Sequence, residues 1–203
     1  MDAYSGNRDV RDHVFGLLGI ISEQTHKDPY SSHLLMTVGD PDRILDGGVS
    51  KRMLTPERLY SRMGIGSIPD GMPDLSVYNH ETVELLLRGI DKRIGKGDID
   101  GSLVVNENGL ITPGSFLIRA DTNDPNLVAE EGAGRTAMRY VSRIVPGASG
   151  FMMSDCGGVT EYRDGKVFRA DNPMDSEDRL VVPVTLSLPE EADEQALSPA
   201  SSQ

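Results

Sequence analysis

The chain has 203 residues and a formal net charge of −12, with 37% hydrophobic and 26% charged residues. This size and composition are typical of one globular domain with its own core, and the negative charge disfavours binding to the backbone of a nucleic acid. The chain has one cysteine, Cys156, so it cannot close an internal disulfide. No run reaches the roughly 20 apolar residues that cross a bilayer, and the apolar run over residues 14 to 21 lacks the cleavage site of a signal peptide. We therefore expect a cytoplasmic protein that binds neither nucleic acid nor membrane.

The basic residues are unevenly distributed, because only five of the 20 are lysine and the others are arginine. An acidic, lysine-poor composition is typical of halophilic, often archaeal, proteins, whose dense carboxylates keep them hydrated in a high-salt cytoplasm. An acidic protein encoded by a GC-rich genome has a similar composition, so both interpretations stay open. In either case a polyanionic ligand requires local positive charge or a metal ion.

The first third of the chain predicts a helix, a strand and an irregular segment. Residues 33 to 38 are a short apolar run that predicts a buried strand, ended by a turn at Gly39. Residues 44 to 73 are rich in glycine and proline and predict an irregular excursion with one helical turn after Thr55. Residues 8 to 26 predict a helix, since apolar side chains recur at helical spacing: Val10, Val14, Leu17, Leu18 and Ile21.

The middle of the chain predicts a second helix followed by a hairpin. Residues 102 to 105 and 110 to 112 flank an asparagine- and glycine-containing turn at 106 to 109, which is the pattern of a β-hairpin. The helix covers residues 80 to 94 and has Asn79 as its N-cap. Its buried stripe is predicted to comprise Val83, Leu86, Leu87 and Ile90.

The following segments predict a third helix and two further strands. The helix covers residues 127 to 145, and the strands cover 151 to 154 and 159 to 162. An Asp-Gly turn at 163 to 166 leads into a further apolar pair. The resulting order of elements predicts an α/β (α+β) fold, with a mixed central β-sheet flanked by helices.

The chain is predicted to hold one main domain and a C-terminal extension. Residues 1 to 170 are assigned to the domain, and residues 171 to 188 to a possible edge strand, the position in which a proline is tolerated. Residues 189 to 203 are acidic, then rich in serine and alanine, and are expected to form a disordered tail.

A first candidate site is the sequence Asp98-Ile99-Asp100-Gly101-Ser102, which leads directly into the strand predicted at residue 102. An aspartate at the start of a strand can hold a divalent cation, and a following glycine lets a ligand approach the backbone. The alternative is a solvated turn before a strand, which is the commoner role of an isolated Asp-Gly pair.

A second candidate is Gly132-Ala133-Gly134-Arg135-Thr136, at the start of the third predicted helix. Backbone N–H groups and the helix dipole favour phosphate at such a position, and an arginine adds charge-assisted hydrogen bonds. Arg139 and Arg143 follow at successive helical turns and could add positive charge. The alternative is a glycine-rich helix start with a surface arginine.

A third candidate is Ser154-Asp155-Cys156-Gly157-Gly158, between two predicted strands. Polar side chains at the end of a strand can meet a ligand, although a plain β-turn would have the same composition.

In their order and spacing, these segments resemble the diadenylate cyclase domain, which joins two ATP molecules into cyclic di-AMP. The family's Asp-Gly-Ala motif corresponds to Asp100-Gly101-Ser102, and its Gly-Thr-Arg-His-Arg-Ala-Ala motif corresponds to the stretch from Gly132 to Met138. The family's Arg-His-Arg triplet is here Gly134-Arg135-Thr136. Further matches are Gly114-Ser115-Phe116-Leu117, Asp124-Pro125-Asn126-Leu127 and Ser154-Asp155, and the resemblance covers roughly residues 8 to 170.

The resemblance implies a role for each of these residues. Asp100 would bind Mn²⁺ or Mg²⁺ and act as the catalytic residue, with Gly101 beside it. Ser102 and Leu117 would line the nucleoside pocket. The triphosphate would be held at the helix start by Ala133, Gly134, Arg135 and Thr136, and the site would be closed by Ser154 and Asp155. The resemblance also implies a face-to-face homodimer, in which each protomer presents one ATP.

Two other functions stay open. A catalytically degenerate domain of the same fold would bind ATP or a cyclic dinucleotide without turnover, which the altered triplet favours. An interaction module would use the acidic tail to recruit a basic partner.

Overall fold

The computed structural model describes residues 5–25, 33–46, 48–65, 75–94, 99–121, 123–127, 132–154 and 157–171. The helices of this part are α1 (Ser5–Thr25), α2 (Pro41–Ile44), α3 (Pro56–Arg62), α4 (His80–Ile90), the 3₁₀ helix η1 (Lys92–Ile94) and α5 (Ala133–Ile144). The strands are β1 (Leu34–Val38), β2 (Ser50–Leu54), β3 (Ser102–Val105), β4 (Ser115–Ile118), β5 (Ser149–Met153), β6 (Val159–Arg163) and β7 (Lys166–Asp171).

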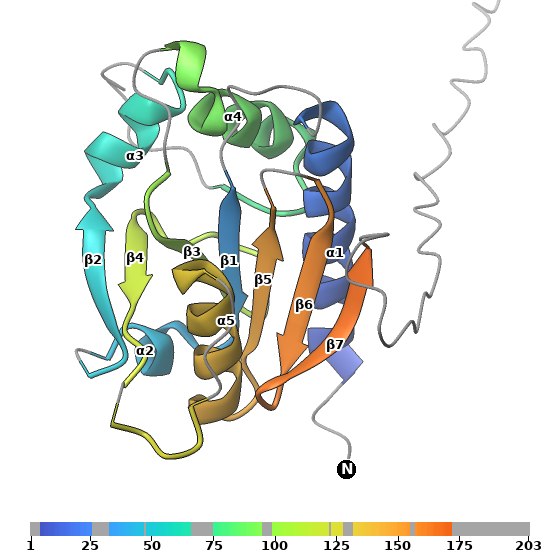
Figure 1. Cartoon of the computed structure of the whole chain (residues 1–203). Helices are drawn as coiled ribbons and strands as arrows, with labels where there is room; N and C mark the ends of the chain where they lie inside the picture. Colours follow the sequence, from blue (N-terminus) through green and yellow to red (C-terminus); the bar gives the residue numbers. More distant parts are fainter. Residues whose placement is uncertain are drawn as a thin grey trace, which may run out of the picture.

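The strands form one seven-stranded sheet in the order β2-β4-β3-β1-β5-β6-β7, so β2 and β7 are its outer strands (Figure 1). The neighbours β1 and β3 run parallel, and the other paired strands are antiparallel. The sheet is therefore mixed, with helices packed against it, which confirms the predicted fold class.

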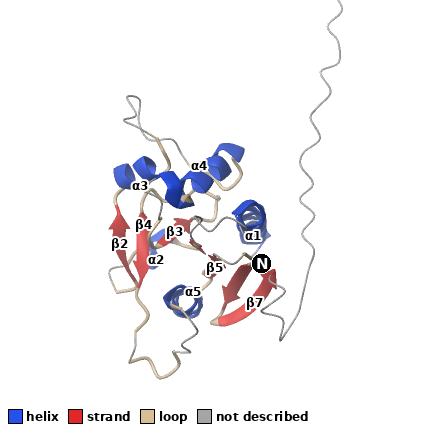
Figure 2. Ribbon diagram, turned by 45° about the horizontal axis from the view of Figure 1, so that its top comes forward, coloured by secondary structure: helices blue, strands red, loops and turns tan. Residues whose placement is uncertain are grey.

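Helices cover both faces of the sheet, and β5 lies between α1 and α5 (Figure 2). The side chains of β1 alternate between the two faces of the sheet, and all of them are buried because helices cover both faces. Met36 belongs to the core that includes residues of α1 and α4, whereas Leu35 belongs to the core beneath α5. The helix α5 comes very close to the sheet at Gly150, where an added Cβ would lie 2.3 Å from the backbone oxygen of Met138. Only glycine allows this approach.

The first helix confirms its predicted pattern. All five apolar residues named for it are buried, and they face the core shared with β1 and β5. The structure begins the helix at Ser5 and ends it at Thr25, close to the predicted bounds. Among the described residues, no helix combines the length and apolar character needed to cross a membrane.

The second predicted helix is shorter than expected. Asn79 does cap it, since its side-chain oxygen accepts a hydrogen bond from the N–H of Glu81 at 3.0 Å. The helix ends at Ile90 because Asp91 adopts an extended conformation, and a single 3₁₀ turn follows. Leu86 and Ile90 are buried as predicted, but Val83 and Leu87 are only partly buried. Leu85 takes a buried place instead, so the predicted stripe is rotated slightly around the helix.

Two strands were missed by the sequence patterns. The segment predicted as irregular contains the strand β2, whereas α3 begins at Pro56, where a helical turn after Thr55 was predicted. The strand β2 is an outer strand whose three central residues are exposed, so it lacks the apolar alternation that marks a strand. The predicted second arm of the hairpin, residues 110 to 112, makes only isolated bridges, whereas β4 is the strand that pairs with β3.

The later elements agree with expectation where the structure describes them. The helix α5 begins at Ala133 and Leu127 is not helical, so the helix is shorter than the predicted 127 to 145. The turn between β6 and β7 has positive φ at Asp164 (51°) and Gly165 (72°), as the Asp-Gly pair predicts. The possible edge strand up to residue 188 lies outside the described residues except for Asp171, which ends β7, and the tail from 189 lies wholly outside.

Candidate nucleotide site

The three candidate segments meet around one residue, Leu35, near the start of β1. In the sheet, Leu35 is opposite Ser102 of β3 on one side and Met152 of β5 on the other. The first turn of α5 lies over the same place, because a Cβ added at Gly134 would be 3.3 Å from the Cδ2 of Leu35 and 3.7 Å from the sulfur of Met152. The start of β3, the end of β5 and the start of α5 are therefore neighbours, although up to 52 residues separate them in the chain.

Asp100 lies at the start of β3 with an exposed side chain and an anchored backbone. Its carbonyl oxygen accepts a hydrogen bond from the Ser115 hydroxyl. Gly101, next to it, has φ of 89°, and an added Cβ would lie 2.9 Å from the backbone of Phe116. Glycine is thus required here by both conformation and space, and Ser115 is a supporting residue whose role no sequence pattern indicated.

The side chain of Ser102 is buried in the interior of the protein, next to the sheet. Its hydroxyl is buried, lies 2.9 Å from the hydroxyl of Thr37 and hydrogen-bonds to the carbonyl of Leu103. The two hydroxyls link β1 to β3 beneath α5. This gives Ser102 a structural role in addition to the predicted one, and Thr37 is a partner that no sequence pattern indicated.

Leu117 lies close to this group but faces the other way. Phe116 is opposite Ser102 in the sheet and packs in the core beneath α5. Since successive side chains of a strand alternate between faces, Leu117 points to the opposite face, where its side chain is 45% exposed. Leu117 lies at the same end of the sheet as Ser102, as expected, but its side chain is not beside that of Ser102.

The start of α5 has the chemistry of an anion site. Gly132, in the N-cap position with φ of 94°, has no side chain to cap the first N–H groups of this 12-residue helix. Those groups and the helix dipole give this end a partial positive charge. Ala133 is exposed, while Gly134, Arg135 and Thr136 are partly buried, and the Thr136 hydroxyl donates to the Gly132 carbonyl at 3.3 Å.

The later arginines of α5 do not join Arg135. Arg139 donates a hydrogen bond to the carbonyl of Gly165 in the β6–β7 turn, at 2.7 Å. Arg143 forms an ion pair with Asp124 and its guanidinium lies over the ring of Tyr140. Both arginines are thus engaged with segments away from the helix start, so the expectation that they add charge there is not supported.

The Asp124–Arg143 pair predicts a specific pH dependence. The guanidinium of Arg143 lowers the pKa of Asp124, helped by the backbone N–H of Asn126. Ionised Asp124 therefore stabilises the folded state above about pH 4, and this stabilisation is lost as the pH falls through the lowered pKa. We expect the Tm of Arg143→Met to lie below that of the native protein at neutral pH, and the gap to close as the pH falls below about 4 and through the lowered pKa of Asp124. Thermal melts across this range test it, and a gap independent of pH would contradict it.

Ser154 follows β5 in a tight connection. Its N–H donates to the carbonyl of Gly158 at 3.0 Å, and the N–H of Gly157 donates to the carbonyl of Ser154 at 3.1 Å. The connection is joined to α1, because the N–H of Gly158 donates to the hydroxyl of Ser22 at 2.8 Å. Asp155, the other residue predicted here, lies outside the described residues.

The carboxylate at this end of the sheet suits a divalent cation that binds together with a phosphate-containing ligand. Within the described part of the chain, no three His, Cys, Asp or Glu side chains are grouped so as to hold a metal ion by themselves. Mg²⁺ is commonly bound through one or two carboxylates together with substrate phosphates. The exposed carboxylate of Asp100 fits that requirement.

Two cavities lie at the opposite end of the sheet. One, of about 520 Å³, is lined by the start of β5, the β6–β7 turn and Arg11 of α1. The other, of about 440 Å³, is lined by the segments that follow β1 and β3. None of the predicted site residues lines either cavity.

Comparison with known proteins leaves the family open. No family model matches the chain, and no curated protein matches it. Among solved structures, the chain is similar to a hypothetical membrane spanning protein from Bacillus cereus, with 15% identity and a TM-score of 0.48 over 77% of this chain and 61% of that one. It is also similar to a double mutant of DacA from Staphylococcus aureus, with 16% identity and a TM-score of 0.42 over 81% of this chain and 87% of that one.

The chain spans about three fifths of the length of the first of these structures. Identities and TM-scores at this level say nothing about activity. The class that the structure itself defines is a mixed seven-stranded α/β sheet with helices on both faces.

Proposed function

We propose that this protein is a diadenylate cyclase, which condenses two ATP molecules into cyclic di-AMP and releases pyrophosphate. The sequence resemblance to that family motivates the proposal. The observation that carries it is the meeting of three separate motif segments around Leu35: the start of β3, the end of β5 and the start of α5.

In the proposed reaction, the 3′-hydroxyl of each ATP attacks the α-phosphorus of the other. In each of the two transfers one P–O bond forms, the bond to pyrophosphate breaks and the hydroxyl proton passes to water, so two pyrophosphates are released for each cyclic di-AMP. Bound Mn²⁺ or Mg²⁺ supplies charge stabilisation at the reacting phosphorus. Asp100 would hold that cation at the start of β3. The N–H groups of Ala133 and Gly134, together with Arg135 and Thr136, would bind the triphosphate at the start of α5.

The remaining residues would position the nucleotide. Gly101 lets the start of β3 pack against the backbone of Phe116, and Ser102 supports the floor of the site through its link with Thr37. Ser154 and Asp155 would close the phosphate end, whereas Leu117, which faces the other side of the sheet, is not given a role in this site. Two protomers would face each other, since each supplies one ATP, and we expect this to occur in the cytoplasm.

A binding domain without turnover is the second candidate. It is favoured by the scarcity of positive charge at the start of α5. Gly134 packs against Leu35, so a larger side chain at that position would require Leu35 to shift, and Arg139 and Arg143 are engaged elsewhere. Of the three arginines of α5, Arg135 is the one in the first turn of the helix, at the proposed triphosphate site.

The test is product formation. The purified chain is incubated with ATP and either Mn²⁺ or Mg²⁺, at low and at multimolar KCl, and cyclic di-AMP is sought by mass spectrometry. Metal-dependent product supports the cyclase. ATP binding without product, measured by calorimetry on the folded protein, supports the binding domain instead. If the folded protein gave no product and bound no ATP, both candidate functions would be overturned.

A further inference from the structure

The cavity between α1, the start of β5 and the β6–β7 turn has a wall rich in positive charge. With a volume of about 520 Å³, it is large enough for a small organic ligand. Its lining includes three cationic side chains, those of Arg11, Arg163 and Lys166, and one carboxylate, that of Asp164. Such a lining favours the binding of an anion at this place, although the chain as a whole carries a net charge of −12.

Two of these cationic side chains, those of Arg11 and Arg163, are held in place by contacts with other residues of the protein. Arg11 is buried and donates to the carbonyl of Gly147. The Nε of Arg163 lies 2.5 Å from the carboxylate of the fully buried Glu161, and its guanidinium stacks on the ring of Phe168 at 3.5 Å. A guanidinium oriented in this way loses little conformational freedom when an anion binds.

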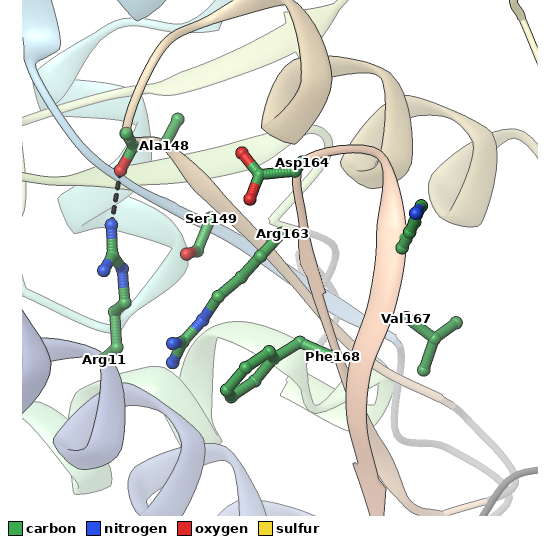
Figure 3. Close-up of a pocket in the computed structure, with 9 residues that line it drawn as sticks. Arg11, Ala148, Ser149, Arg163, Asp164, Val167 and Phe168 are labelled. Carbon is green, nitrogen blue, oxygen red and sulfur yellow. Dashed lines mark hydrogen bonds between the residues drawn. The ribbon is translucent and has the colours of Figure 1, made fainter.

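The cavity also contains a buried hydroxyl with an unmet hydrogen bond. Ser149 lines the cavity, and its Oγ has no hydrogen-bond partner among the described residues. Buried polar groups without partners are rare and costly. Figure 3 shows the side chains of Arg11, Ser149 and Arg163 gathered on one region, with Phe168 beside them.

We propose that this cavity binds a phosphate ester. Arg163 and Lys166 would contact the phosphate, Arg11 would supply buried positive charge, and the Ser149 hydroxyl would donate to a phosphate oxygen. The ring of Phe168, half exposed at the rim, would contact the organic part of the ligand. This site is at the opposite end of the sheet from Asp100 and does not depend on the proposed cyclase activity.

The test measures binding of AMP, inorganic phosphate and adenosine by calorimetry at low salt. We expect AMP to bind and adenosine to bind weakly or not at all, and the affinity for AMP to fall as KCl is raised. Lys166→Gln removes an exposed charge and should weaken AMP binding about tenfold, a loss of the size expected for one charge-assisted hydrogen bond. Lys51→Gln, on the outer strand β2, is the matched control and should not change it.

Further variants separate this site from the others. Arg135→Gln alters the proposed triphosphate site at the start of α5, and it therefore reports whether AMP binds there instead of in this cavity. Ser149→Ala should weaken AMP binding while leaving the Tm unchanged or higher, since it removes a buried hydroxyl without a partner. Equal binding of AMP by the native protein, Lys166→Gln and Ser149→Ala would overturn the proposal, as would loss of AMP binding in Arg135→Gln alone.

Discussion

Asp100→Asn is expected to reduce cyclic di-AMP synthesis by at least about 100-fold, because the variant loses the charge that would hold the metal ion at the reacting phosphorus. The fold should be unaffected. Asp100 is exposed, and the Ser115 hydroxyl anchors its backbone carbonyl, not its carboxylate. Mass spectrometry of the product and a thermal melt of the same preparation measure both effects.

Glu107→Gln is the matched control for this experiment. Glu107 is an exposed carboxylate that follows β3 at its other end, so its neutralisation changes the net charge equally without touching the proposed site. It should retain native activity. If Asp100→Asn made product as fast as the native chain, Asp100 would have no catalytic role.

The second large effect is on stability and concerns Glu161. This carboxylate is completely buried in the sheet, and its two oxygens lie 2.5 Å from the Nε atoms of Arg163 and Arg169. Arg169 is also held by Asp12 at 2.8 Å and lies over the ring of Phe15, so the group ties β6 and β7 to α1. Removing one partner of a buried ion pair leaves the others uncompensated.

Glu161→Gln is therefore expected to lower the free energy of unfolding by about 3 kcal/mol. Urea denaturation followed by circular dichroism measures it. Glu84→Gln is the matched control, because Glu84 forms an exposed ion pair with Arg88 at 3.8 Å on the surface of α4. That pair should contribute no more than about 0.5 kcal/mol. Similar losses in the two variants would show that the buried network does not stabilise the fold.

The elements that could be predicted are those that bury a regular stripe of side chains. The five apolar residues of α1 recur at helical spacing and are all buried, and Asn79 caps α4 through a contact two residues away. Such features depend on neighbours in the sequence. The strand β2 could not be found in this way, because its central residues are exposed and its partner, β4, lies about 60 residues further along the chain.

The features of the candidate site also divide into those that the local sequence could predict and those that it could not. The spacing of small and charged residues indicated that Asp100, Gly134, Arg135 and Ser154 belong to motif segments. It could not show that Ser102 is buried against Thr37, that Leu117 faces the opposite side of the sheet, or that Arg139 binds the β6–β7 turn. These outcomes depend on strand register and on the rotation of α5 over the sheet.

The sequence alone determined the features that depend on local spacing and backbone preference. These are the helices with a clear apolar period, the buried strand β1, the Asp164-Gly165 turn and the presence of three motif segments. Only the tertiary structure decided that those segments meet at Leu35. It also decided that the cavity at the other end brings Arg11 of α1 beside Ser149 and Arg163, which are paired on the neighbouring strands β5 and β6. The physical reason is that pairing between β1, β3 and β5 is non-local: hydrogen bonds and packing between strands far apart in sequence choose the neighbours, and no local pattern records that choice.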